Sequence, residues 1–130
     1  MSSPPPLRYR ILCDGELIGS SELEEREEDM GVAVGRFVPT PAYERVRPVF
    51  LLFMDAHADG ESEPDTAKLK AYEAARARLA LSVTDAAGTA IAASGVAVLD
   101  FSRERRGEGA VEVEVYFATP QKFAQLPPVG

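Results

Sequence analysis

The sequence contains one cysteine and one histidine, and each shortage limits the chemistry that the chain can carry out. A lone cysteine, Cys13, permits neither an intramolecular disulfide nor a cysteine-rich zinc cluster. A Ser-His-Asp or Cys-His catalytic set would have to use His57, the sole histidine. The spacing of Gly31 and Gly35 fits neither a dinucleotide fingerprint nor a phosphate loop. We therefore expect no cofactor and favour a non-catalytic protein.

Long apolar runs and an excess of basic residues are also missing. The longest apolar run, Pro48–Met54, is far shorter than the roughly 18 residues that span a membrane, and the N-terminal residues lack the apolar stretch of a signal peptide. The chain has 14 basic and 21 acidic residues and a formal net charge of −7, so its surface should repel phosphate backbones. We expect a cytoplasmic protein that binds neither membranes nor nucleic acid.

The length and hydrophobic content fit one domain. With 130 residues and 45% hydrophobic content, the chain can bury a core without a metal or disulfide. We therefore expect a single domain over residues 1–130. Both ends are rich in proline, which cannot donate a backbone hydrogen bond, so we expect residues 1–6 and 119–130 to form flexible or extended tails.

Several segments have the composition of β-strands. Asp14-Gly15 is a typical two-residue hairpin turn and joins strands expected at Leu7–Cys13 and Glu16–Leu23. Alternation of valine and glutamate makes the last strand the clearest. The remaining strands are expected at Val32–Val38, Leu79–Asp85, Thr89–Phe101 and Val111–Phe117.

Two further segments have the composition of helices. Thr40-Pro41 is a typical helix start, and the apolar face that follows extends to His57. Pro48 either kinks this helix or separates two shorter ones. A second helix is expected at Thr66–Arg78, where good helix formers predominate. The order of elements predicts an α+β fold, with a mainly antiparallel sheet of about six strands and two helices packed on one face.

The loop at residues 55–65, DAHADGESEPD, has the alternating acidic groups of a calcium loop. The oxygen ligands at positions 1, 5 and 9 would be Asp55, Asp59 and Glu63. Position 3 is His57, a nitrogen donor, and position 12 is Thr66, which cannot replace a bidentate glutamate. We interpret the loop as a solvated connector between helices, with weak divalent-cation binding as an alternative.

The strongest charge run is acidic. Its carboxylates are Glu22, Glu24, Glu25, Glu27, Glu28 and Asp29. The run is interpreted as a solvated surface or as a docking surface for a basic partner protein, and paired-carboxylate catalysis is the least favoured interpretation because it requires a partly dry site. The concentrated basic patch consists of Arg103, Arg105 and Arg106. It would contact an acidic partner or a phosphate, or simply keep a loop soluble.

The stretch Asp14–Tyr43 carries a DG turn, an SELE segment, Met-Gly, G-x-F-x-P and a tyrosine. In this pattern the chain resembles small uncharacterised bacterial proteins. The resemblance implies a bacterial one-domain protein and implies no activity. In size, acidity and α+β pattern the chain is also similar to immunity proteins that neutralise toxins.

Two functions from different classes follow from these patterns. The first is a protein-interaction module, either an antidote or an adaptor, with an acidic docking surface. The alternative is a small-molecule-binding protein or minor enzyme with a pocket between helices and sheet. Its polar groups would be Tyr43, Tyr72 and Tyr116. Homodimerisation through the apolar segment Val49–Met54 is left open.

Overall fold

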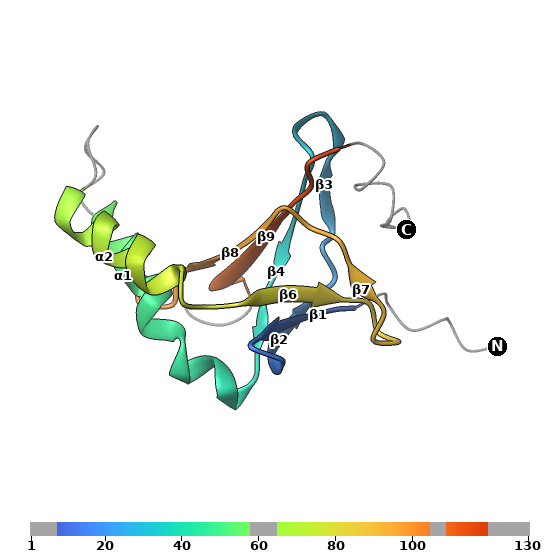
Figure 1. Ribbon diagram of the computed structural model, residues 1–130, viewed down its shortest axis with the longest axis horizontal. Coiled ribbons are helices and arrows are strands. Elements are labelled where there is room, and N and C mark those ends of the chain that lie inside the picture. Colours follow the sequence, from blue (N-terminus) through green and yellow to red (C-terminus); the bar gives the residue numbers. More distant parts are fainter. Residues whose placement is uncertain (1–7, 58–64, 105–108, 120–130) are drawn as a thin grey trace.

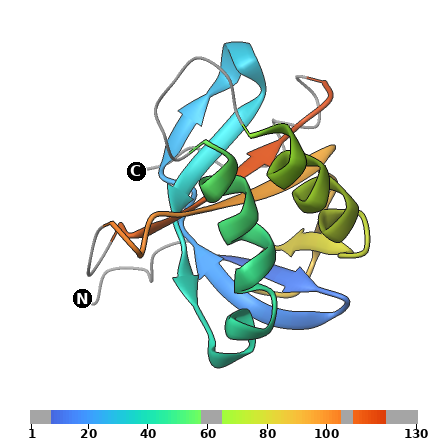
Figure 2. The ribbon, with the colours of Figure 1, turned by 90° about the vertical axis from the view of Figure 1, so that its left-hand side faces the viewer.

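The computed structural model describes residues 8–57, 65–104 and 109–119. These residues form an α+β fold in which most of the regular structure is antiparallel sheet, as the sequence predicts (Figure 1). The strands in this part of the chain number nine and form two sheets, where the sequence indicated one sheet of about six. The two α-helices lie together on one side of the sheets (Figure 2).

The first sheet has five strands in the order β5-β2-β1-β6-β7. Its strands are β1 (Tyr9–Cys13), β2 (Glu16–Ser21), β5 (Val38–Pro39), β6 (Leu81–Thr84) and β7 (Ala90–Ile91). Strands β1 and β2 form the predicted hairpin. Asp14 and Gly15 both have positive φ angles, of 52° and 83°, which is the geometry that a two-residue hairpin turn requires.

The second sheet has four strands in the order β3-β4-β9-β8. Its strands are β3 (Glu25–Glu27), β4 (Val32–Arg36), β8 (Gly95–Asp100) and β9 (Val111–Tyr116). In β9, Val113 and Val115 are fully buried while Glu112 and Glu114 are partly exposed, as the alternation of the sequence predicts.

The single strand expected at Thr89–Phe101 is wrong. The segment forms two strands, β7 in the first sheet and β8 in the second. Between them the chain bends at residues 92–94, and the Ser94 amide donates to Tyr116 O at the end of β9 (2.7 Å). The small side chains of Ala92 and Ala93 allow this bend, and its signal in the sequence is Ser94-Gly95, a pair that marks either a bulge within one strand or a turn between two.

The first predicted helix divides into two. A short 3-10 helix, η2 (Pro41–Arg45), is followed by α1 (Arg47–Ala56), and Pro48 lies in the first turn of α1, where its missing N–H costs nothing. Thr40 does not cap with its side chain; its Oγ1 donates to Leu17 O (2.7 Å).

The second helix, α2 (Thr66–Arg76), begins after Asp65, whose side-chain carboxylate accepts a hydrogen bond from Lys68 N (3.1 Å) and so caps the helix.

The hydrophobic core contains side chains from both sheets, η2 and α1. Phe37, Tyr43 and Phe50 form an aromatic series, with ring centroids 5.2 Å apart for the first pair and 6.3 Å for the second. The fully buried aliphatic side chains include Ile11, Ile18, Leu23, Val83, Val98, Val113 and Val115. This core joins the helical side of the molecule to the sheets.

Two chain segments pass from one sheet to the other at the same place, which we call the sheet corner (Ser21–Glu24 and Gly35–Val38). Leu23 is fully buried with a φ of 46°, and its amide donates to Ser21 Oγ (3.1 Å). Gly35 lies against this turn: a Cβ at Gly35 would stand 2.3 Å from Ser21 Oγ and 2.8 Å from the Leu23 backbone. Only glycine fits at this contact.

Replacing Gly35 should therefore destabilise the whole fold. We expect Gly35→Ala to lower the free energy of unfolding by about 3 kcal/mol, because an inserted methyl group must displace backbone atoms. Gly95→Ala is the matched control, because its Cβ would meet its nearest neighbour at 3.8 Å. Urea denaturation of the two variants compares them. Equal stability of both variants would show that the corner contact is not a constraint.

Candidate functional site

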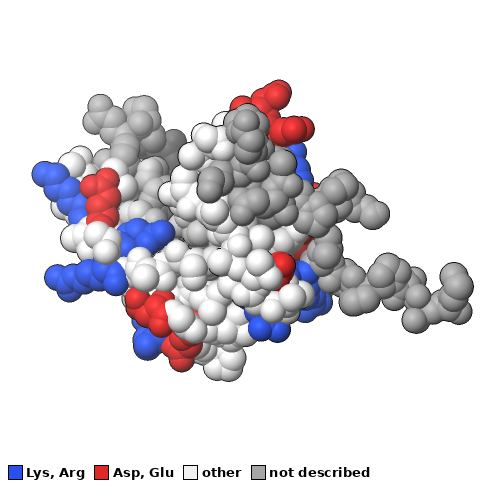
Figure 3. All heavy atoms as spheres, turned by 45° about the vertical axis from the view of Figure 1, so that its right-hand side comes forward, with Lys and Arg blue, Asp and Glu red and all other residues white. Residues whose placement is uncertain are grey.

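The acidic run lies largely in a hairpin that projects from the second sheet. We call residues Glu25–Arg36 the acidic hairpin; it contains β3, the short helix η1 (Glu28–Met30) and β4. In Figure 1 it extends beyond the sheets at the top of the molecule, and Figure 3 shows acidic side chains gathered at that end. Its exposed residues are Glu25, Glu27, Glu28, Asp29 and Met30, together with Arg36 at its base. The Met30 side chain is 73% exposed.

The acidic hairpin is held in place by contacts at its base and its turn. Arg26 Nε donates to Leu23 O (2.6 Å), and its guanidinium lies 6.0 Å from the centre of the Tyr9 ring. Gly31 has a φ of 64° and accepts a hydrogen bond from Phe117 N at 2.7 Å. A Cβ at Gly31 would stand 2.8 Å from Phe117 O. The exposed tip is therefore presented by a fixed backbone.

Glu22 and Glu24, the other two predicted docking residues, lie at the sheet corner instead. The Glu24 carboxylate accepts a hydrogen bond from Arg36 N (2.8 Å), so this side chain replaces a backbone partner where the β3–β4 pairing ends. Glu22 is half-buried and lines a groove at the corner. The acidic run is thus divided between two surfaces with different surroundings.

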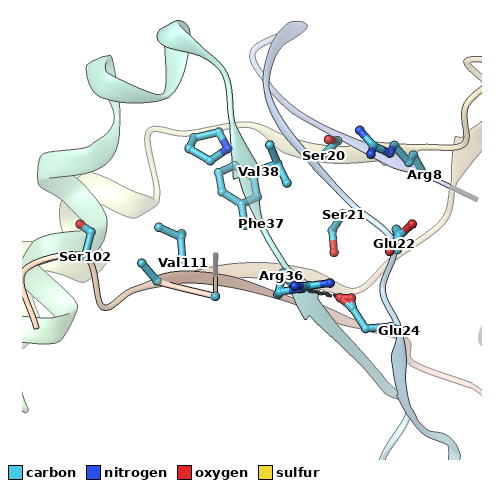
Figure 4. A pocket seen from close by; sticks show the side chains of 13 residues that line it. Arg8, Ser20, Ser21, Glu22, Glu24, Arg36, Phe37, Val38, Ser102 and Val111 are labelled. Atoms are coloured by element: carbon cyan, nitrogen blue, oxygen red, sulfur yellow. Dashed lines mark hydrogen bonds between the residues drawn. The ribbon is translucent and has the colours of Figure 1, made fainter. Parts of the chain in front are cut away.

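That groove, the corner groove, has a volume of about 730 Å³. Its floor is apolar and contains Phe37, Val38, Pro39, Ala110 and Val111. Polar side chains stand around it, as Figure 4 shows: Arg8, Ser20, Ser21, Glu22, Glu24, Arg36 and Ser102. Sequence reasoning missed this site because its walls come from four separate segments of the chain. A weak signal was the apolar Phe37-Val38-Pro39 directly after a strand.

Two residues that the sequence assigned to different sites form an ion pair. Arg103 Nη2 pairs with Asp55 Oδ1, so the charges of Arg103 and Asp55 are matched by each other. The same nitrogen lies 3.4 Å from Leu51 O.

Four other predicted residues lie outside the described residues: Asp59, Glu63, Arg105 and Arg106. Within residues 8–57, 65–104 and 109–119, no three His, Cys, Asp or Glu side chains are grouped as a metal site.

His57 and Cys13 have structural surroundings. His57 Nδ1 lies 2.9 Å from Phe53 O, and the two rings are 4.5 Å apart. Cys13 is fully buried; burial, and then the negative charge of Asp14, raise the pKa of its thiol. A buried thiol with a raised pKa is a poor nucleophile.

The three tyrosines predicted to serve a pocket lie on three different elements, and none of them lines the corner groove. Tyr72 on α2 packs against Phe53 with ring centroids 5.1 Å apart, and burial raises the pKa of Tyr72. Tyr116 at the end of β9 is 39% exposed; partial burial, followed by the nearby Glu114 carboxylate, raises its pKa. Tyr43 is buried, and its hydroxyl is engaged by Asp100.

Asp100 is the centre of a buried polar network. Its carboxylate accepts from Tyr43 Oη (2.6 Å), Arg47 Nε (3.2 Å) and both the amide and hydroxyl of Ser102. Arg47 Nη2 also donates to Ser102 Oγ (2.8 Å). Burial alone would raise the pKa of Asp100, but the hydrogen bonds from Ser102 and Tyr43 and the charge of Arg47 together lower it. Burial and the adjacent Asp100 raise the pKa of Tyr43. The network ties β8 to η2 and α1.

The class that these features define is a two-sheet α+β protein with a projecting acidic hairpin and a groove at the sheet corner. No protein-family model matches the chain, and no curated protein or solved structure was found to be similar to it. The resemblance carried by Asp14–Tyr43 therefore stays a prediction. None of the described helices combines the length and apolar character needed to cross a membrane.

The Asp100 network leads to a pH-dependent prediction. Asp100→Asn should destabilise the protein by roughly 3 kcal/mol at pH 7, because Arg47 loses its carboxylate partner in a buried site. The pKa of Asp100 is lower in the folded protein than in the unfolded chain. The contribution of Asp100 to the free energy of unfolding is therefore complete above about pH 4 and is lost as the pH falls through the pKa of the folded state.

Urea denaturation at several pH values measures this difference. The stability gap between wild type and Asp100→Asn should narrow as the pH falls below about 4. Glu104→Gln, which changes an exposed carboxylate shortly after Asp100 in the chain, is the control and should show no such gap. A gap that is independent of pH would mean that Asp100 does not act through its charge.

Proposed function

We propose that this protein is a non-catalytic protein-interaction module whose acidic hairpin binds a basic surface of a partner protein. The observation that carries the proposal is the exposed Met30 at the projecting tip, which follows the exposed carboxylates of Glu27, Glu28 and Asp29 directly in the chain. An apolar side chain within a polar rim is the usual anatomy of a protein–protein contact.

The exposure of Met30 exceeds that of every other large hydrophobic residue in the described part of the chain. Val38 is 56% exposed, and Leu17 and Tyr116 are each 39% exposed. Transfer of a methionine side chain from water into a partner's pocket contributes roughly 1.5–3 kcal/mol. Its backbone is already fixed by the Gly31–Phe117 contact, so little ordering is required on binding.

The charge of the hairpin supports a basic partner. Glu25, Glu27, Glu28 and Asp29 are all exposed on one projecting segment. The whole chain carries a formal net charge of −7, so its long-range field has the same sign. Such a field accelerates and orients the approach of a positively charged protein more than it tightens the final complex.

Protection of a sheet edge is the competing explanation of these charges. β3 is an edge strand of the four-stranded sheet, and charged side chains on edge strands prevent pairing with other chains. This explains Glu25 and Glu27, which lie on β3. Glu28, Asp29 and Met30 follow the strand and lie outside its pairing, so protection of the edge does not explain them. Edge protection in particular gains nothing from an exposed methionine.

An antidote that covers a basic toxin surface and an adaptor are both compatible with this use of the hairpin. The resemblance of Asp14–Tyr43 to bacterial proteins supports a bacterial setting, and the free, buried Cys13 suits a reducing cytoplasm. Homodimerisation through Val49–Met54 stays a prediction that a solution mass would test. Phe50 within that segment is already fully buried in the core.

Reversal of the hairpin charges should remove partner binding. Affinity capture from the native host compares wild type with a variant in which Glu27, Glu28 and Asp29 are changed to lysine. We expect wild type alone to retain a specific basic protein, and we expect its association rate to fall steeply between low and moderate salt. Surface plasmon resonance with the captured protein measures the rate.

The matched control places the same charge change elsewhere. Changing Glu44, Glu73 and Glu104 to lysine alters three exposed carboxylates outside the hairpin and should leave capture unchanged. Retention of the same partner by the hairpin variant would refute the proposal. Self-association of that variant without loss of any partner would show that the charges serve only to protect the β3 edge.

Met30→Ala separates the apolar contact from the charge. We expect dissociation of the partner to accelerate about tenfold while the association rate changes little, because steering depends on the carboxylates. Met30 is 73% exposed, so the free energy of unfolding should be unaffected. Identical dissociation rates for wild type and Met30→Ala would exclude the tip from the interface.

A further inference from the structure

The floor of the corner groove is apolar and preformed. Phe37 and Val111 are only 4% and 7% exposed, and they are joined by a hydrogen bond from Phe37 N to Val111 O (2.8 Å). Val38 is 56% exposed above them. The same backbone contacts that fix the sheet corner fix this floor, so a ligand would find it in place.

One wall of the groove brings a cation, a hydroxyl and an anion to the same face. The β1–β2 register pairs Tyr9 with Ser21 and Arg10 with Ser20, and side chains of paired residues point to the same side of a sheet. Arg8, Ser20 and Glu22 therefore share one face, opposite to the buried face of Tyr9 and Ser21. The exposed Val38 pairs with Ser20 and lies on this same face, whereas Phe37 packs against Gly19 on the buried face. In Figure 4 they stand together at one side of the groove.

These three polar side chains are available to a ligand. Within the described residues, Arg8, Ser20 and Glu22 form no ion pair and no hydrogen bond through their side chains. The neighbouring Glu24 differs, because its carboxylate is occupied by Arg36 N. The wall thus offers a guanidinium, a hydroxyl and a carboxylate beside the exposed apolar side chain of Val38.

The chemistry of these groups defines a ligand class. A guanidinium and a hydroxyl together bind a carboxylate, and a carboxylate accepts hydrogen bonds from an ammonium group. The exposed Val38 beside them packs against an aliphatic or aromatic side chain. We propose that the corner groove binds a zwitterionic α-amino compound with an apolar side chain, its carboxylate against Arg8 and Ser20 and its ammonium against Glu22.

Simpler ligands match the groove less well. A plain carboxylate would face the negative charge of Glu22, and a plain amine would face the positive charge of Arg8. A neutral apolar molecule would cover both charges without pairing either, which costs free energy. The volume of about 730 Å³ exceeds that of one amino acid, so a dipeptide of two apolar residues fits the same chemistry.

The test is an NMR titration of the full chain with four probes. L-phenylalanine and the dipeptide Leu-Phe carry both charges, 3-phenylpropionate lacks the ammonium group and 2-phenylethylamine lacks the carboxylate. We expect both zwitterions to shift the amide signals of Ser20, Val38 and Ala110. Phenylalanine should bind about tenfold more tightly than either single-charge analogue, because each lacks one charge-assisted hydrogen bond.

Two variants connect the charges to the probes. Arg8→Gln should abolish the preference for phenylalanine over 2-phenylethylamine, and Glu22→Gln should abolish the preference over 3-phenylpropionate. Arg78→Gln changes an exposed arginine outside the groove and should preserve both preferences. The spectrum of each variant without ligand shows whether its fold is retained.

Three outcomes would overturn the proposal: no probe shifts the groove signals, the single-charge analogues bind as tightly as phenylalanine, or both variants keep the wild-type preferences. A groove that responds only to the protein partner of the acidic hairpin would belong to the protein interface instead. Since Met30 and the groove are tested by different variants and probes, each proposal stands or falls separately.

Discussion

The contact between Gly35 and the Ser21–Leu23 turn is the constraint on which both candidate surfaces depend. Because residue 35 has no side chain, two backbones can meet there. Both chain segments therefore cross between the sheets at one corner. One crossing leads into the acidic hairpin, and the other forms the floor of the corner groove. The corner therefore positions both surfaces on the sheets and away from the helices.

The helical side of the molecule is fixed by a different interaction. Asp100 is buried and is paired with Tyr43, Arg47 and Ser102, so its polar groups are satisfied within the protein. Removal of one member would leave a buried charge unpaired, which makes such networks costly to alter. The polar groups between helices and sheet are thus used in holding the fold, whereas the exposed carboxylates of the acidic hairpin and the Arg8, Ser20 and Glu22 side chains of the corner groove are not part of this network.

Local patterns in the sequence predicted the elements that depend only on neighbours in the chain, such as the Asp14-Gly15 turn and the alternation in Val111–Tyr116. Leu23 is different, because leucine rarely adopts a positive φ and the distant Gly35 packs against this turn. The acidic run is contiguous, so the sequence revealed its charge, but its division between hairpin and corner depends on the fold. No periodicity indicates the corner groove, because antiparallel register and the two crossings bring its distant segments together.

The acidic run serves the fold at some positions and not at others. Glu24 satisfies the Arg36 amide, and Glu25 and Glu27 keep the edge strand β3 charged. Met30 has neither of these roles, and its 73% exposed side chain gains almost none of the hydrophobic free energy that burial would give. A rigid hairpin that holds an apolar side chain in water is the feature that favours the partner surface proposed above, and the adjacent carboxylates favour a basic one.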